Sequence, residues 1–170
     1  VGLVAFMRIL DRLNRDLTIE LVEQRAVALL IAQECLPYLR KGIRNREDLQ
    51  RAVDIVREKL PHFQVALTDR TQVLAASGCD LPATPLPIAA REAMAQRETV
   101  VMEVSKGHRS AMLSAPLVTD EQVIGALLLI APTGPNLVLD ADVKTLESLA
   151  QFFSVMLELG ETEHQIALRK

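Results

Sequence analysis

The segment from Ala111 to Ala131 has the strongest strand pattern in the chain and constrains the fold more than any other feature. Apolar residues alternate along 111–117, and a second apolar run covers 123–131, with the polar Thr119–Glu121 between them. Two such runs joined by a short polar turn are typical of an antiparallel β-hairpin. The sequence therefore predicts a sheet, and the other segments must supply its remaining strands and its cover.

Three further segments have strand character. Residues 63–67 and 73–76 flank the polar turn Asp69–Gln72 and predict a first hairpin, and alternation over 100–104 predicts a strand just before the strong pair. The chain is therefore expected to form five antiparallel strands.

Two shorter helices are expected, one before the first hairpin and one between that hairpin and the strand over 100–104. Asn45 is a typical N-cap, Asp48 stands three residues later, and an apolar stripe follows until Pro61. A second short helix is predicted over 88–96, after the proline-rich stretch 82–87.

Amphipathic helical patterns also occupy both ends of the chain. One runs from Leu10 to Cys35 and is expected to end at Pro37 and Gly42, while the other begins at Asp140 and covers about 30 residues, or about 45 Å of helix. We expect these helices to pair with a second copy of the chain through Leu10, Leu13, Leu17, Leu21, Phe153 and Leu157.

Together these elements predict an α+β fold with a five- to six-stranded antiparallel sheet, helices packed on one face, and long N- and C-terminal signalling helices. Residues 1–36 are expected to form the N-terminal linker helix, 37–138 the compact core, and 139–170 the C-terminal helix.

The composition argues against several classes of function. A net charge of -3 provides no basic excess for binding a phosphate backbone, and with 3% aromatic residues the chain cannot build base-stacking platforms. Nucleic acid is therefore not an expected partner. Val1–Leu10 is apolar but shorter than the roughly 20 residues that a spanning helix needs.

No catalytic or metal-binding pattern is present in the sequence. The histidines His62, His108 and His164 lie on separate elements without a partner at ligand spacing, and none of the familiar nucleophile, phosphate or dinucleotide motifs occurs. Cys35 and Cys79 match no disulfide framework, which suits a reducing compartment. We predict no catalytic residue, no metal site and no evident cofactor.

A ligand pocket is nevertheless compatible with the residues of the predicted sheet. Met102 and Met112 fall on adjacent strands and could line an adaptable pocket, while the small residues Thr68 and Ser114 would leave room beneath the covering helix. The alternative is that the methionines simply fill the core.

Three stretches resemble the GAF domain of LytS-type sensor histidine kinases. Ile31–Gly42 reads I-A-Q-E-C-L-P-Y-L-R-K-G, like the helix that enters this domain, and Val65–Gly78 is similar to its first hairpin. Ser110–Ile130 resembles the general GAF pattern, in which a strand ends in Pro-Leu and the next carries Ile-Gly.

This resemblance implies a cytosolic sensory domain of a membrane-bound two-component kinase. The implied partners are a second copy of the chain, a kinase module in the same polypeptide and a LytTR-type response regulator, with a membrane anchor preceding residue 1. In GAF domains the loop at Cys79 opens over the ligand cavity, so the residues expected to contact a small molecule are Thr68, Cys79, Met102, Met112 and Ser114.

One departure from the family pattern keeps a second interpretation open. Many members have a His-His pair soon after the glycine that ends the second strand, but here Gly78 is followed by Cys79, Asp80, Leu81 and Pro82. The domain could thus be a degenerate, dimerising spacer that binds nothing. The general GAF pattern would also allow a domain of a transcription regulator or a phosphodiesterase.

Overall fold

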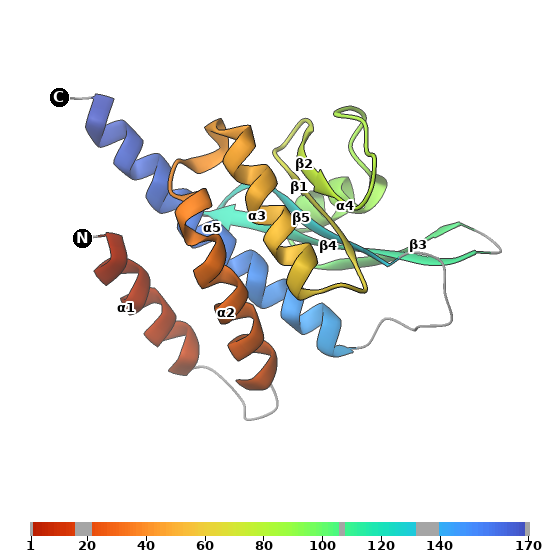
Figure 1. The fold of residues 1–170 in the computed structure, drawn as a ribbon, viewed down its shortest axis with the longest axis horizontal. Coiled ribbons are helices and arrows are strands. Elements are labelled where there is room, and N and C mark those ends of the chain that lie inside the picture. The colour runs from red at the N-terminus through yellow and green to blue at the C-terminus, as the bar shows by residue number, and fades with distance from the viewer. Residues whose placement is uncertain (1, 16–21, 106–107, 132–139, 169–170) are drawn as a thin grey trace.

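The computed structural model describes residues 2–15, 22–105, 108–131 and 140–168. Within these ranges, the side chains at 9–15, 22–24, 103–105, 108–110 and 163–168 lie outside the description. The elements, shown in Figure 1, are α1 (Gly2–Arg15), α2 (Val22–Leu39), the 3-10 turn η2 (Gly42–Arg44), α3 (Arg46–Lys59), β1 (Gln64–Thr68), β2 (Val73–Ser77), α4 (Ile88–Gln96), β3 (Val100–Ser105), β4 (His108–Thr119), β5 (Gln122–Ala131) and α5 (Asp140–Leu168).

The five strands form one antiparallel sheet in the order β2-β1-β5-β4-β3, which confirms the predicted sheet. The strand β5 is central, and it is buried from Gly125 to Ile130 because its side chains are apolar on both faces. At Gly125 the strand passes so close to β1 that a Cβ atom would collide with the carbonyl group of Thr68.

Helices cover both faces of the sheet, and the prediction of helices on one face is wrong (Figure 1). Leu113 of β4 and Leu127 of β5 belong to a core shared with α2, α3 and α5. Met112 and Leu128, which alternate with them, pack with α4 on the other side. Strands that are apolar on both faces cannot leave one face in water, so a second layer is required.

The helix α5 is part of this core along its first two-thirds. Leu146, Leu149, Phe153 and Leu157 are completely buried, and burial of each such side chain stabilises the fold by about 1.5–3 kcal/mol. The same core includes Phe6 and residues of α2, so it extends on both sides of the segment 37–138.

The two N-terminal helices run in opposite directions instead of forming the predicted single rod from Leu10 to Cys35 (Figure 1). Phe6 of α1 is 3% exposed, and it lines a cavity of about 240 Å³ together with Leu36 and Arg40 of α2 and Met156 of α5. The start of α1 thus lies beside the end of α2, since burying Phe6 there outweighs extending the rod. Residues 16–21 lie outside the described residues.

The sequence predicted that α2 would end at Pro37. In the structure the helix continues to Leu39. Pro37 and Gln33 are both exposed, so the Gln33 carbonyl group that loses its helical donor faces solvent. The predicted end at Gly42 is closer to the observed one, and Gly42 has a φ of +69°, which favours glycine.

Among the described helices, none combines the length and the apolar character needed to span a membrane.

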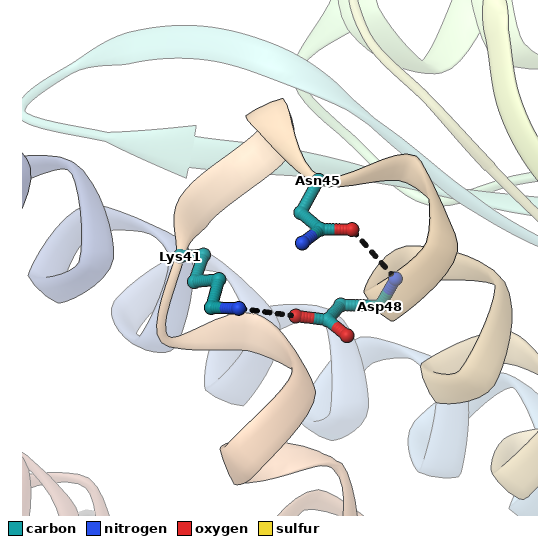
Figure 2. A network of polar contacts seen from close by, with 3 residues as sticks. All are labelled: Lys41, Asn45 and Asp48. Carbon is teal, nitrogen blue, oxygen red and sulfur yellow. Dashed lines mark hydrogen bonds and ion pairs between the residues drawn. The ribbon is translucent and has the colours of Figure 1, made fainter.

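The start of α3 has the predicted N-cap, which Figure 2 shows. The side-chain oxygen of Asn45 accepts a hydrogen bond of 3.1 Å from the backbone N–H of Asp48, and the Asp48 carboxylate lies 3.7 Å from the Lys41 ammonium group. Asn45 satisfies one of the backbone donors that no helical carbonyl can reach, and the acidic first turn complements the helix dipole.

We expect Asn45→Ala to lower the free energy of unfolding by about 1 kcal/mol, because it removes the oxygen that accepts from Asp48. Urea denaturation measures this change. Asn45→Asp retains an acceptor and is the matched control, so an equal loss in both variants would contradict the assignment of the cap.

Candidate functional site

The face of the sheet beneath α4 is lined by small and flexible side chains. Ala66 of β1, Ala126 of β5 and Ala89 and Ala90 of α4 are buried there, with Met112 of β4 and Leu128 and Ile130 of β5 beside them. Half-buried Cys79, Leu81, Met94 and Met102 close the margin of the layer. We call this set of residues the α4 layer.

Two buried hydroxyl groups, those of Thr68 and Ser114, lie on this face. Their register partners in β5 are Ala126 and Leu128, and both partners belong to the α4 layer, so the two hydroxyl groups face it from β1 and β4. Thr68 is 1% exposed and Ser114 is 0% exposed, yet neither hydroxyl group has a hydrogen-bond partner among the described residues. A buried hydroxyl group without a partner costs about 1–3 kcal/mol.

Cys79 is half-buried at the start of the loop that follows β2. Burial raises the pKa of its thiol, the nearby Arg57 guanidinium lowers it, and Asp80 raises it, with a net increase. The thiol therefore stays protonated at neutral pH and is a poor nucleophile. The loop is tied to β2 by a hydrogen bond of 2.9 Å from the Val73 N–H to the Ala83 carbonyl group.

The second cysteine lies on the other side of the sheet. Burial, and to a lesser extent the charge of Glu34, raise the pKa of Cys35 to about 12, and its sulfur contacts the Ala52 carbonyl oxygen at 3.5 Å. Because Cys35 belongs to the core beneath α2 and Cys79 to the α4 layer, the two thiols cannot form a redox pair.

The structure brings the five predicted ligand residues to one face. Cys79, Met102 and Met112 belong to the α4 layer, Met102 is the register partner of Met112, and Thr68 and Ser114 point into the layer. Their role in binding stays a prediction.

The sequence predicted that six residues of the terminal helices would face a second copy of the chain, and for two of them the structure shows otherwise. Phe153 and Leu157 are completely buried in the chain's own core and therefore face no outer surface. The side chains of Leu10, Leu13, Leu17 and Leu21 lie outside the described residues, as do those of His108 and His164. His62 is exposed on the surface.

A cavity of about 690 Å³, which the sequence did not predict, lies on the α5 side of the sheet. Its floor includes Ala115 of β4 and Ala150 and Ser154 of α5, and its rim carries Arg97 and Glu147. The small residues Ala150 and Ser154, four apart on one helix face, are the only sequence signal for this hollow.

Ser154 joins α5 to the sheet at this cavity. The β4–β5 register shifts between Leu117 and Val118, and the Val118 N–H donates a hydrogen bond of 3.1 Å to the Ser154 hydroxyl oxygen. The Ser154 hydroxyl group in turn donates to the Ala150 carbonyl oxygen at 2.7 Å. This contact fixes the position of α5, the helix by which the chain leaves the core, relative to β4.

Within the described part of the chain, no three His, Cys, Asp or Glu side chains gather in a way that could hold a metal ion.

The sequence profile of the GAF domain matches residues 8–157 of the chain. Sensor histidine kinase/phosphatase LytS from Staphylococcus aureus is 27% identical over 183 aligned residues, which cover 100% of this chain and 31% of that protein. The chain therefore spans about a third of the length of the curated relatives that it matches.

Solved GAF structures have the same fold. The GAF domain of a phosphoenolpyruvate-protein phosphotransferase from Acinetobacter aligns with a TM-score of 0.62 at 13% identity, over 81% of this chain and 97% of that one. The free methionine-R-sulfoxide reductase of Neisseria meningitidis aligns with a TM-score of 0.60 at 18% identity, over 87% and 96% of the two chains. At these identities the likeness extends to the fold alone.

The two unpartnered hydroxyl groups predict an unusual response to substitution. We expect Ser114→Ala and Thr68→Val to raise the free energy of unfolding of the ligand-free chain by about 1 kcal/mol each, because they remove a buried group that makes no hydrogen bond. Thermal and urea denaturation measure the change.

Ser154→Ala is the matched control, because its hydroxyl group makes two hydrogen bonds and its loss should destabilise the chain by about 1 kcal/mol. A loss of stability in Ser114→Ala as large as that in Ser154→Ala would show that the Ser114 hydroxyl group has a partner.

Proposed function

Because the chain belongs to the GAF family, we propose that it is the sensory domain of a LytS-like sensor histidine kinase and relays a signal to a kinase module in the same polypeptide. The similarity to LytS along the whole chain supports this assignment over a transcription regulator or a phosphodiesterase. In the full-length protein, 1–36 and 139–170 would be the entering and leaving signalling segments. A membrane anchor would precede them, and a LytTR-type response regulator would receive the phosphoryl group.

The observation that carries a sensory role is the pair of unpartnered hydroxyl groups of Thr68 and Ser114 in the α4 layer. Buried polar groups almost always have partners, and exceptions point to a group that completes them. Apolar side chains surround the two hydroxyl groups, and Arg57 and Asp80 lie near Cys79, so the ligand that suits the layer is small and able to both accept and donate hydrogen bonds.

Strand β4 supplies a path from this layer to the exit helix. Ser114 faces the α4 layer, and four residues later the Val118 N–H is bound by Ser154 of α5. A ligand can shift α5 only if it binds two arrangements of β4 with different affinities, and a coupling of about 1–3 kcal/mol is typical of such relays.

The domain itself is proposed to be non-catalytic. Some proteins with this fold are enzymes, as the free methionine-R-sulfoxide reductase shows. In this chain the pKa of Cys79 is raised and Cys35 lies in a different core, so cysteine chemistry has no support.

The dimer proposed for this domain would use the N-terminal helices. Seven large apolar side chains of the described residues are more than a third exposed, and five of them lie on α1 and α2: Leu3, Val4, Met7, Val27 and Leu30. A concentration of exposed apolar side chains on paired helices suits a second copy of the same helices, by isologous packing.

A dimerising spacer without a ligand is the second candidate. It is favoured by the lack of a histidine pair directly after Gly78 and by the side chains of Met94, Met102 and Met112, which occupy the α4 layer. The two functions differ in one measurable respect, which is ligand binding.

A thermal-shift screen with small neutral amides, alcohols, amino acids, organic acids and nucleotides distinguishes them. A ligand at 100 times its Kd should stabilise the wild-type chain by about 2.7 kcal/mol. The Thr68→Val/Ser114→Ala double variant should lose this response, while Thr145→Val in α5 should retain it. Silence of the wild-type chain across the screen favours the spacer.

Sedimentation equilibrium tests the dimer. Leu30→Glu places a charge on the exposed α2 surface and should shift the chain toward monomer, because a charge in an apolar interface is desolvated without a partner. Ile88→Glu is the control, since Ile88 is similarly exposed, at 57%, but lies on α4. A wild-type chain that is monomeric at all concentrations would contradict the proposed dimer.

A further inference from the structure

A cavity of about 240 Å³ is lined by α1, α2 and α5, three helices that lie together on one side of the sheet (Figure 1). Its side chains come from all three helices: Leu3, Phe6, Leu36, Arg40, Met156 and Leu159. Phe6 and Met156 belong to the core on the α5 side of the sheet, whereas the α4 layer lies on the other side. The cavity is therefore separate from the site to which the sensory role was assigned above.

The size and the lining of this cavity suit a small aromatic group. Five of the six side chains are apolar, and Phe6 and Met156 among them are buried. An apolar cavity of about 150 Å³ is already large enough to bind benzene. Aromatic rings also make favourable contacts with the ring edge of a phenylalanine and with the thioether of a methionine.

A close contact between backbones borders the cavity. Gly160 of α5 also lines it, and a Cβ atom at this residue would lie 2.5 Å from the Arg40 carbonyl oxygen and 2.7 Å from the Gly42 nitrogen. The helix α5 and the chain at the end of α2 are thus as close here as backbone atoms allow. Because they cannot move closer together, they cannot fill the space beside the contact.

Arg40 is the one charged residue among the described residues that line the cavity, and it is exposed. The neighbouring cations are engaged elsewhere. The Lys41 ammonium group lies 3.7 Å from the Asp48 carboxylate, and the Arg44 guanidinium group lies 2.9 Å from that of Glu161. Among the described residues, Arg40 forms no ion pair. A guanidinium group at the opening of an apolar cavity provides two parallel donors for a carboxylate.

We propose that this cavity binds a small aromatic carboxylic acid. The ring lies against Phe6 and Met156, and the carboxylate, ionised at neutral pH, pairs with the Arg40 guanidinium group at the opening. Such a ligand contacts α1, α2 and α5 at once, so it fastens the entering signalling segment to the leaving one. This coupling does not depend on whether the α4 layer binds a ligand.

Methyl NMR of the methionines tests the proposal, because these side chains report on both sites. Met156 lines the cavity, and Met94, Met102 and Met112 belong to the α4 layer. Benzoate is the probe. We expect it to shift the Met156 methyl resonance in a saturable manner and to leave the three resonances of the α4 layer unchanged.

Arg40→Gln tests the role of the charge. It should weaken the binding of benzoate about five-fold, the scale of one exposed ion pair, and leave the binding of benzyl alcohol, an uncharged analogue, unchanged. Arg91→Gln is the matched control, because Arg91 is also an exposed arginine but lies on α4. This variant should keep the wild-type affinity for benzoate.

Leu159→Phe tests the position of the ligand, because it adds a ring to the lining of the cavity. It should abolish the binding of benzoate and of benzyl alcohol, while unchanged methionine resonances of the α4 layer show that the variant keeps its fold. A Met156 resonance that does not respond to benzoate, equal losses in Arg40→Gln and Arg91→Gln, or undiminished binding in Leu159→Phe would overturn the proposal.

Discussion

The packing of α5 against the sheet is the interaction on which the rest of the structure depends. Its buried leucines and phenylalanines complete the core between the sheet, α2 and α3, and its Ser154 hydroxyl group binds the backbone of β4 at a point where the sheet register shifts. A helix that forms the core cannot move independently of the sheet, because interiors are packed at nearly crystalline density. The exit helix is therefore an integral part of the domain that it would report on.

The central strands β4 and β5 separate two layers with different properties. On the α5 side they contribute large leucines to a dense core, and on the α4 side they face alanines, methionines and the hydroxyl groups of Thr68 and Ser114. The close approach of Gly125 to Thr68 fixes β5 against β1 at the margin of the second layer. The layer beneath α4 thus differs from the core around α5 in holding two buried hydroxyl groups that lack a hydrogen-bond partner among the described residues.

The sequence predicted the elements well where the signal is local. Alternation, together with apolar runs beside polar turns, located all five strands, the Asn45 cap located α3, and the prolines before Ile88 located α4, because these patterns depend on neighbouring residues. Strand alternation also predicted that Thr68, Met102, Met112 and Ser114 share the α4 face, while Cys79 was placed there by the resemblance to GAF domains.

The sequence failed where distant contacts decide the outcome. The apolar seam from Leu10 to Cys35 fits a single continuous helix equally well, and the burial of Phe6 beside α2 and α5, which favours the reversed α1, involves residues far apart in the sequence. Phe153 and Leu157 have the periodicity of a dimer seam, but periodicity identifies an apolar face without identifying what covers it. The absence of partners for Thr68 and Ser114 depends on every neighbour in three dimensions, so no sequence pattern could reveal it.

A double-mutant cycle between Ser114 and Ser154 tests most directly whether β4 connects the two layers. Ser114 lies in β4 and faces the α4 layer. Ser154 lies in α5, on the opposite face of the sheet, and accepts a hydrogen bond from the Val118 N–H of β4. Side chains that share no contact usually act independently, so the changes in the free energy of unfolding caused by two such substitutions add to within about 0.5 kcal/mol. The account predicts that Ser114→Ala and Ser154→Ala together depart from additivity by more than about 0.5 kcal/mol in urea denaturation. Additive changes would contradict a relay through this strand.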